Sequence, residues 1–65
     1  MRIKELREAK GWSQTKLAEE SGLSQSFIHA IEAGKKSPTM RSLWKLSKAL
    51  GVPVSEIIEF KEETK

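Results

Sequence analysis

The sequence contains no cysteine and a single histidine, His29, among its 65 residues. The lack of cysteine excludes disulfides and thiolate metal sites, and one histidine cannot hold a metal without several carboxylate partners. No apolar run approaches the roughly 20 residues that cross a bilayer, and the opening segment MRIKELREAK lacks the apolar stretch of a signal peptide. We therefore expect a cytoplasmic protein that uses no metal, no cofactor and no membrane.

Groups suited to catalysis are also scarce. A chain of this length forms one domain that buries only ~60% of its unfolded surface, which leaves little room for a large catalytic cleft. Beyond isolated carboxylates and His29, the sequence offers no acid, base and nucleophile that would converge. We expect no catalytic residues, one domain over residues 1–60, and a frayed charged tail over residues 61–65.

Glycines and serines divide the sequence into five expected helices, which indicates an all-α fold. Each glycine follows a segment with helical periodicity, where helices commonly end in a left-handed residue. The helices are expected over about residues 2–10, after Ser13, after Ser24, over about residues 40–50 and from near Pro53. The residues expected to face inward are Ile3, Leu6, Leu17, Ala18, Ile28, Ile31, Met40, Leu43, Leu46, Ala49, Leu50, Val54, Ile57 and Ile58.

Residues 13–34, SQTKLAEESGLSQSFIHAIEAG, have the outline of a helix-turn-helix DNA-binding motif. Gly22 can take the positive φ of a turn between two helices, and the small side chain of Ala18 lets the second helix cross closely. Trp12 and Leu23 directly precede the two serine caps, in the spacing of a hydrophobic staple on each helix. Polar side chains then line the second helix.

Positive charge is concentrated after this motif. Residues 35–55 contain no acidic residue but carry Lys35, Lys36, Arg41, Lys45 and Lys48. Cations beside a candidate recognition helix suit phosphate oxygens, because each neutralised phosphate also releases counterions. The alternative is an ordinary solvated surface, but the position next to the two-helix motif favours phosphate contact.

Several segments together resemble the Cro and phage-repressor type of helix-turn-helix domain, the XRE family. They are the WSQ opening, LAEESGLS, the I-x-x-IE-x-G close and ALGV before a last short helix, and the resemblance covers about residues 2–60. It implies a compact five-helix, lambda-repressor-like domain with the motif at its second and third helices. It also implies a sequence-specific transcriptional regulator, in particular a repressor, that reads the major groove of a palindromic double-stranded DNA operator as a homodimer.

By position, the resemblance makes Gln25 the leading base reader, since a glutamine amide can pair with both N7 and N6 of adenine. Ser26 can serve a base edge or a phosphate. Phe27 lies off the inward face and is expected to be exposed, where its ring could contact thymine methyls; the alternative is a ring folded back over a neighbouring helix. His29 is expected to donate to a phosphate or a base, in preference to acting as a pH sensor or metal ligand.

Two alanines weaken the far half of the recognition helix. Ala30 and Ala33 stand where members of the family often carry long polar residues, and each offers only a methyl group. We expect base reading to concentrate at the start of the helix and specificity to depend more on groove shape and dimer spacing.

The resemblance also implies contacts with the DNA backbone. Gln14 is expected to touch a phosphate and to support Gln25, while Arg41 is expected near the edge of the minor groove. Lys35 and Lys36 match the family's phosphate-contacting loop. The full set of backbone candidates is Ser13, Gln14, Lys16, Lys35, Lys36 and Arg41.

A structural ion pair is implied between Arg7 and Glu32, holding the first helix against the recognition helix. The alternative is two separate surface charges. In the C-terminal half, Trp44, Ile58 and Phe60 are candidates for a dimer surface, because they exceed what one small core requires. The alternative is that Trp44 caps the core and Phe60 packs over the first helix.

A protein-binding adaptor or antitoxin component is the other function considered. The same scaffold can be reused without DNA binding, and Trp44 with the last helix would then form the protein-binding surface. Salt-dependent binding to duplex DNA discriminates between the two functions.

Overall fold

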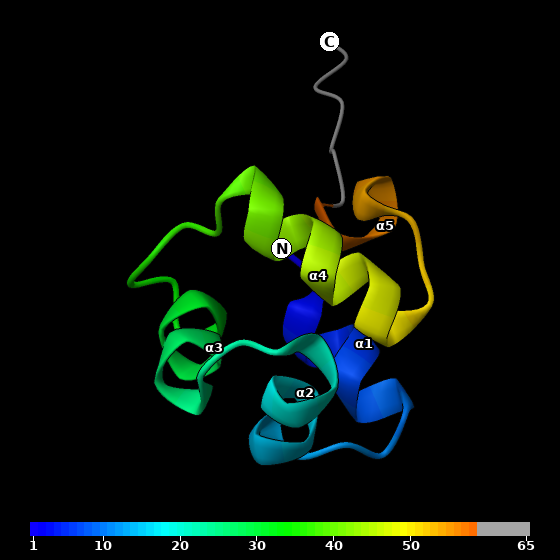
Figure 1. Cartoon of the computed structure of the whole chain (residues 1–65), viewed down its shortest axis with the longest axis horizontal. Helices are drawn as coiled ribbons and strands as arrows, with labels where there is room; N and C mark the ends of the chain where they lie inside the picture. Colours follow the sequence, from blue (N-terminus) through cyan, green and yellow to red (C-terminus); the bar gives the residue numbers. More distant parts are fainter. Residues whose placement is uncertain (59–65) are drawn as a thin grey trace, which may run out of the picture.

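The computed structural model describes residues 1–58, and that part of the chain is folded entirely from helices and their connections (Figure 1). The helices are α1 (Ile3–Ala9), α2 (Gln14–Ser21), α3 (Gln25–Glu32), α4 (Met40–Leu50) and α5 (Val54–Ile58). No strand occurs within residues 1–58, so the predicted all-α, five-helix fold is confirmed. Phe60, the expected domain end at residue 60 and the tail over 61–65 lie outside the described residues.

Side-chain caps determine where the middle helices begin. The Ser13 hydroxyl accepts a hydrogen bond from the Lys16 N–H at 3.0 Å, and the Ser24 hydroxyl accepts one from the Phe27 N–H at 3.0 Å. Both predicted caps are confirmed. Thr39 caps α4 through the Ser42 N–H at 3.1 Å; this cap was not predicted, although a threonine directly before an apolar stripe is a helix-start signal.

Gly22 makes the turn between α2 and α3 as predicted. It ends α2 with φ +77°, and its N–H donates to the carbonyl of Ala18 at 2.9 Å. Residues with a side chain rarely adopt this backbone conformation. The turn therefore needs only two more residues, Leu23 and Ser24, before α3 begins, and the two helices of the motif pack directly against each other.

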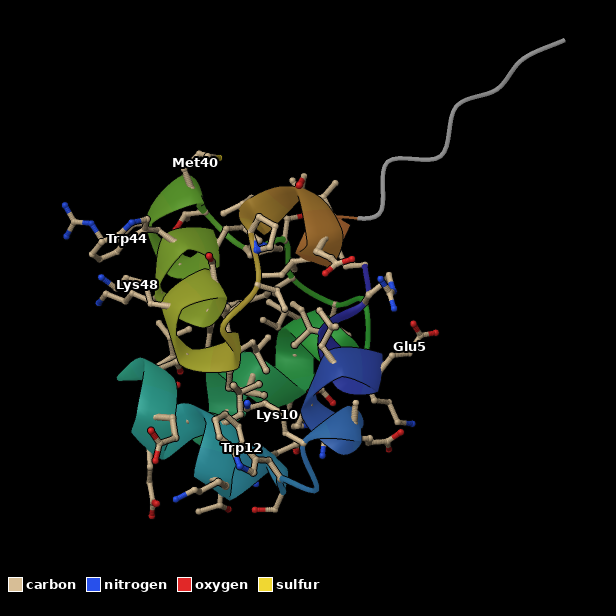
Figure 2. The ribbon with its side chains drawn as sticks, turned by 90° about the vertical axis from the view of Figure 1, so that its right-hand side faces the viewer. Glu5, Lys10, Trp12, Met40, Trp44 and Lys48 are labelled. Atoms are coloured by element: carbon tan, nitrogen blue, oxygen red, sulfur yellow. The ribbon has the colours of Figure 1, made fainter. Side chains whose placement is uncertain are left out.

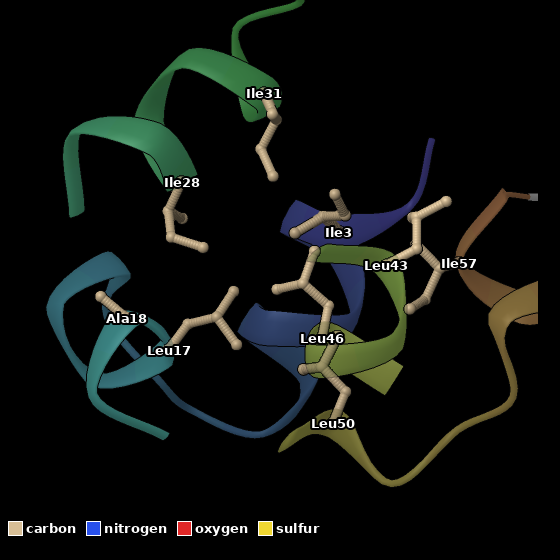
Figure 3. Packing of buried hydrophobic residues seen from close by; sticks show 9 residues of the cluster. All are labelled: Ile3, Leu17, Ala18, Ile28, Ile31, Leu43, Leu46, Leu50 and Ile57. Atoms are coloured by element: carbon tan, nitrogen blue, oxygen red, sulfur yellow. The ribbon is translucent and has the colours of Figure 1, made fainter. Parts of the chain in front are cut away.

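One apolar core joins all five helices (Figure 3). Leu17, Ile28 and Leu46 are completely buried at its centre, and α4 packs against both α2 and α5. Trp12 and Leu23 are half-buried against this core, as their staple positions predicted. Its members are Ile3, Leu17, Ala18, Ile28, Ile31, Leu43, Leu46, Leu50 and Ile57.

Two residues expected to face inward do not. Met40 is 71% exposed, because the inward side of the first turn of α4 is taken by Ser42 and Leu43, and Met40 lies roughly 200° around the helix from Ser42. Ile58 is 38% exposed at the end of α5, whereas its neighbour Ile57 is completely buried. Adjacent residues of a helix point about 100° apart, so only one of the two enters the core.

The helices are all short. No helix within residues 1–58 has the length and apolar character needed to cross a membrane.

Candidate nucleic-acid interface

The surface of α3 that faces away from the core carries polar side chains. Ile28 and Ile31 point into the core, and this orientation leaves Gln25, Ser26 and His29 exposed. Gln25 and His29 are one turn apart and therefore lie side by side on the helix, with Ser26 next to them. The three side chains together present amide, hydroxyl and imidazole groups that can hydrogen-bond to base edges.

Phe27 does not belong to this exposed surface, and the expectation that it is exposed is wrong. It is half-buried and packs against the core. The ring borders an open hollow of about 430 Å³ between the start of α3 and the start of α4. The ring therefore packs on the apolar core and does not stand free in solvent, which is close to the alternative that the sequence left open.

The second half of α3 carries little that could read a base. Ala30 is half-buried, and Ala33 ends the helix as an exposed methyl group. The exposed polar groups of α3 are therefore concentrated in its first five residues.

A buried ion pair holds the C-terminal end of α3. The guanidinium of Arg7 donates to both carboxylate oxygens of Glu32, at 2.8 Å and 3.1 Å. The Glu32 side chain is only 4% exposed, and Arg7 also donates to the carbonyl of Trp12 at 2.7 Å. One side chain of α1 thereby connects α1, the turn before α2 and the end of α3.

Gln14 completes this arrangement in a way the sequence did not predict. Its amide donates to a carboxylate oxygen of Glu32 at 3.0 Å. The predicted support of Gln25 by Gln14 is therefore not what the structure shows, because the amide of Gln14 is directed to the opposite end of α3. We refer to Arg7, Gln14 and Glu32 together as the clamp.

The clamp shifts the pKa values of both its charged members. Burial alone would raise the pKa of Glu32, but hydrogen bonds from Arg7 and Gln14 and the positive charges of Arg7 and Lys4 outweigh burial, so the pKa lies below its ordinary value. The hydrogen bond to Glu32 raises the pKa of Arg7. Both groups therefore stay charged near neutral pH, and the pair is bidentate and hydrogen-bonded, as buried charges require.

A shallow hollow of about 310 Å³ lies beside the clamp and brings α1 close to α3. Lys4 and His29 line it together with the clamp residues. The sequence analysis did not name Lys4 as a residue near α3. The signal that could have placed it there is its position three residues before Arg7, on the same side of α1.

The cations predicted to contact phosphate are exposed, and their surroundings differ. Lys35 and Lys36 follow α3, and their N–H groups donate to the carbonyl of Ala30 at 2.9 Å and 3.3 Å, which ties the loop to the helix. Lys16 instead forms an ion pair with Glu20 at 3.0 Å. Contact with DNA would compete with that pair. Arg41 is exposed in the first turn of α4.

Within residues 1–58 there is no group of three or more histidine, cysteine or acidic residues placed to hold a metal ion.

Comparison with known proteins identifies the scaffold that carries this surface. A family profile described as "Helix-turn-helix" matches residues 3–57. The chain belongs to the helix-turn-helix family. This agrees with the resemblance seen in the sequence. The chain is also similar in sequence to transcription regulators and in structure to a solved protein.

The helix-turn-helix regulator SutR of Escherichia coli strain K12 is 43% identical over 56 residues, covering 86% of this chain and 32% of SutR. The immunity repressor protein of Bacillus phage phi105 is 37% identical over 57 residues, covering 88% of this chain and 40% of the repressor. The chain thus spans less than half the length of either relative.

The crystal structure of the restriction-modification controller protein C.AhdI from Aeromonas hydrophila has the same fold. The two align with a TM-score of 0.83 and 39% identity, covering 86% of this chain and 85% of that one.

A second exposed surface of this helix-turn-helix domain lies on α4. Met40, Trp44 and Lys48 follow one another at intervals of one turn on its outer side (Figure 2). Trp44 is 58% exposed, and the ammonium of Lys48 lies 5.0 Å from the centre of its ring. Trp44 therefore does not cap the core, which removes one of the two alternatives for this residue.

Proposed function

We propose that this domain binds double-stranded DNA in a sequence-specific manner and regulates transcription, with α3 inserted into the major groove. The observation that carries the proposal is the contrast within α3: Gln25 and Ser26 at its start are exposed, while Glu32 at its other end is hydrogen-bonded within the clamp. A fixed helix with free hydrogen-bonding groups suits the reading of base edges. The similar proteins include a transcriptional regulator and a phage immunity repressor, which supports this role.

We assign the predicted contacts other than Phe27 as follows. Gln25 pairs with adenine through its amide, Ser26 meets an adjoining base edge or phosphate, and His29 reaches a base or the backbone from the next turn. Lys35, Lys36 and Arg41 contact phosphates, and this positions the helix without specifying sequence. Ser13, Gln14 and Lys16 stand at the start of α2 as further backbone contacts.

Repression is the regulatory outcome we favour, as in the similar phage immunity repressor. A domain of this size represses by occupying an operator and needs no catalytic step, so we infer a binding protein rather than an enzyme. It would work in the cytoplasm of a prokaryotic host, at the nucleoid, because the operator is there.

A second copy of the chain is the partner we propose. One small DNA-binding domain contacts little DNA surface, and two copies related by a two-fold axis can bind half-sites about one helical turn apart. The exposed side chains of Trp44 and Ile58 supply apolar surface for such a contact. Analytical ultracentrifugation should show a dimer that weakens in Trp44→Ser, while Glu19→Ser, an exposed site on α2, leaves the association unchanged.

Selection of binding sites from random duplex DNA tests the function directly. We expect a palindromic sequence, with adenines in each half-site and salt-dependent affinity. Failure to enrich any sequence, with no salt-dependent binding, would contradict the proposal. That result would favour the adaptor or antitoxin role, for which the exposed Trp44 face is the specific observation.

A further inference from the structure

The hollow beside Phe27 has the composition of an anion site. It opens between the first turns of α3 and α4 and is lined by Leu23, Ser24 and Phe27 on one side and by Thr39, Arg41 and Lys45 on the other. Two of its lining residues are cationic and none is acidic. An anion entering the hollow would therefore meet positive charge without repulsion.

The two cations have no anionic partner within the part of the chain that the structure describes. Arg41 and Lys45 are one turn apart on α4, a spacing at which like charges repel and destabilise a helix. Lys48, one turn further on, lies over the ring of Trp44 instead. Binding of an anion between Arg41 and Lys45 would relieve their repulsion.

Ser24 adds a hydrogen-bond donor to the same hollow. Its oxygen accepts the capping bond from the Phe27 N–H, and its hydroxyl proton has no acceptor within residues 1–58. The hydroxyl protons of the opposite wall are already used, because Thr39 donates to Ser42 and Ser42 donates to the Thr39 carbonyl. Ser24 is therefore the hydroxyl in this hollow that remains able to donate to a bound oxygen.

The remaining wall is apolar. Leu23 and Phe27 are half-buried and keep part of their surface at the hollow. A free inorganic anion gains nothing from such a wall, whereas the carbon atoms of a sugar attached to a phosphate would pack on it.

We propose that this hollow seats one phosphodiester of DNA, with its oxygens held by Ser24, Arg41 and Lys45 and its deoxyribose against Leu23 and Phe27. This inference rests on the proposed DNA-binding function and deepens it. It makes Lys45 a backbone contact, and it makes Phe27 part of a sugar-contacting wall rather than a base reader.

Replacement of the lysine tests the site. Each phosphate contact adds about −0.9 to the slope of log affinity against log salt concentration. If a contact is worth nothing at 1 M salt, it therefore strengthens binding roughly 8-fold at 0.1 M salt. Lys45→Gln should therefore bind a random-sequence 20-bp duplex roughly 8-fold more weakly and with a slope smaller by about 0.9. Lys48→Gln is the matched control and should change neither quantity.

A chemical probe locates the phosphate. In a series of duplexes, each duplex carries a neutral methylphosphonate in place of one phosphate. At one position in the series, this replacement should weaken binding by the wild type but should not weaken binding by Lys45→Gln. Ser24→Asp keeps a good cap but adds a carboxylate, so it should fold with an unchanged melting temperature and lose more than 8-fold in affinity.

The outcomes separate this site from the function on which it rests. Equal slopes for Lys45→Gln and the wild type, or equal losses for Lys45→Gln and Lys48→Gln, would overturn the phosphate site while leaving DNA binding intact. The phosphate site would also be overturned if every methylphosphonate weakened binding by Lys45→Gln as much as it weakened binding by the wild type. A wild-type protein that binds no duplex would overturn the proposed function and the site together.

Discussion

The two ends of α3 differ in whether their polar side chains are buried and hydrogen-bonded or exposed. At its C-terminal end, the carboxylate of Glu32 is 4% exposed and receives hydrogen bonds from Arg7 and Gln14. At its N-terminal end, Gln25 and Ser26 are exposed side chains. One helix of eight residues thus has a fixed end and a free end.

The difference separates the side chain of α3 that stabilises the fold from those that remain exposed. No buried side-chain nitrogen or oxygen in the described part of the chain lacks a hydrogen-bond partner. Within α3, the carboxylate of Glu32 is used in folding, whereas the side chains of Gln25 and Ser26 remain exposed. Changes at the two ends should therefore separate stability from recognition.

The largest effect is expected from breaking the fixed end. Arg7→Ala leaves the buried carboxylate of Glu32 without its main partner, and removal of one member of such a pair typically costs about 3–5 kcal/mol of unfolding free energy. Most of the stability of a domain this small would be lost. Thermal and urea denaturation measure the change. Lys16→Ala, which breaks an exposed pair, is the control and should cost under ~1 kcal/mol; a melting shift below ~4 °C for Arg7→Ala would contradict the role of the clamp.

A smaller effect at the same end should follow from acid. The pKa of Glu32 is lower in the folded chain than in the unfolded chain, so the unfolded state binds more protons between the two values. The contribution of Glu32 is therefore complete above its ordinary pKa and is lost as the pH falls through the lowered folded value. Urea unfolding from pH 7 to pH 3 should show a steeper decline for the wild type than for Glu32→Gln. Parallel curves would show that this carboxylate is not the titrating group.

At the free end, Gln25→Ala should change recognition and leave stability alone. Loss of a bidentate amide pair should remove about 1–3 kcal/mol of discrimination at one base pair of each half-site. Competition among selected duplexes that differ at single positions measures this loss, with melting temperature as the check on folding. Uniform weakening over all sequences would instead place Gln25 on the backbone.

The smallest effect is expected beside the two ends, in the loop that follows α3. Lys36→Gln should weaken binding to every duplex by a similar factor, roughly 8-fold at 0.1 M salt, with a salt slope smaller by about 0.9. Lys10→Gln is a suitable control, because the ammonium of Lys10 lies over the ring of Trp12 at 4.9 Å (Figure 2). Any change in base preference for Lys36→Gln would mean that it reads sequence.

The comparison also shows where inference from sequence was sufficient. Ser13 and Ser24 mark helix starts through interactions with residues three positions away, and Gly22 marks a turn through its own backbone freedom. Such local features follow from periodicity and residue type. The Arg7–Glu32 contact, between residues 25 positions apart, was implied only by resemblance to the family.

The incorrect predictions concern side chains whose environment depends on packing or on the exact face of a helix. Phe27 is half-buried because it packs on the core, and Met40 is exposed because Ser42 and Leu43 occupy the inward side of that turn. Gln14 faces Glu32 rather than Gln25, because the end of α3 returns to the start of α2. The outcomes at Phe27 and Gln14 depend on the position of a second element, which helical periodicity within one segment does not contain, whereas the exposure of Met40 follows from its angle around α4.

The sequence by itself determined the five helices, the caps at Ser13 and Ser24, the central turn and the family, because these depend on residues near one another in the chain. The tertiary structure alone decided which polar groups are used in folding and which remain free, because hydrogen bonding and burial depend on the neighbours that packing supplies. For α3, that decision fixes Glu32 within the clamp and leaves Gln25 and Ser26 exposed to a ligand.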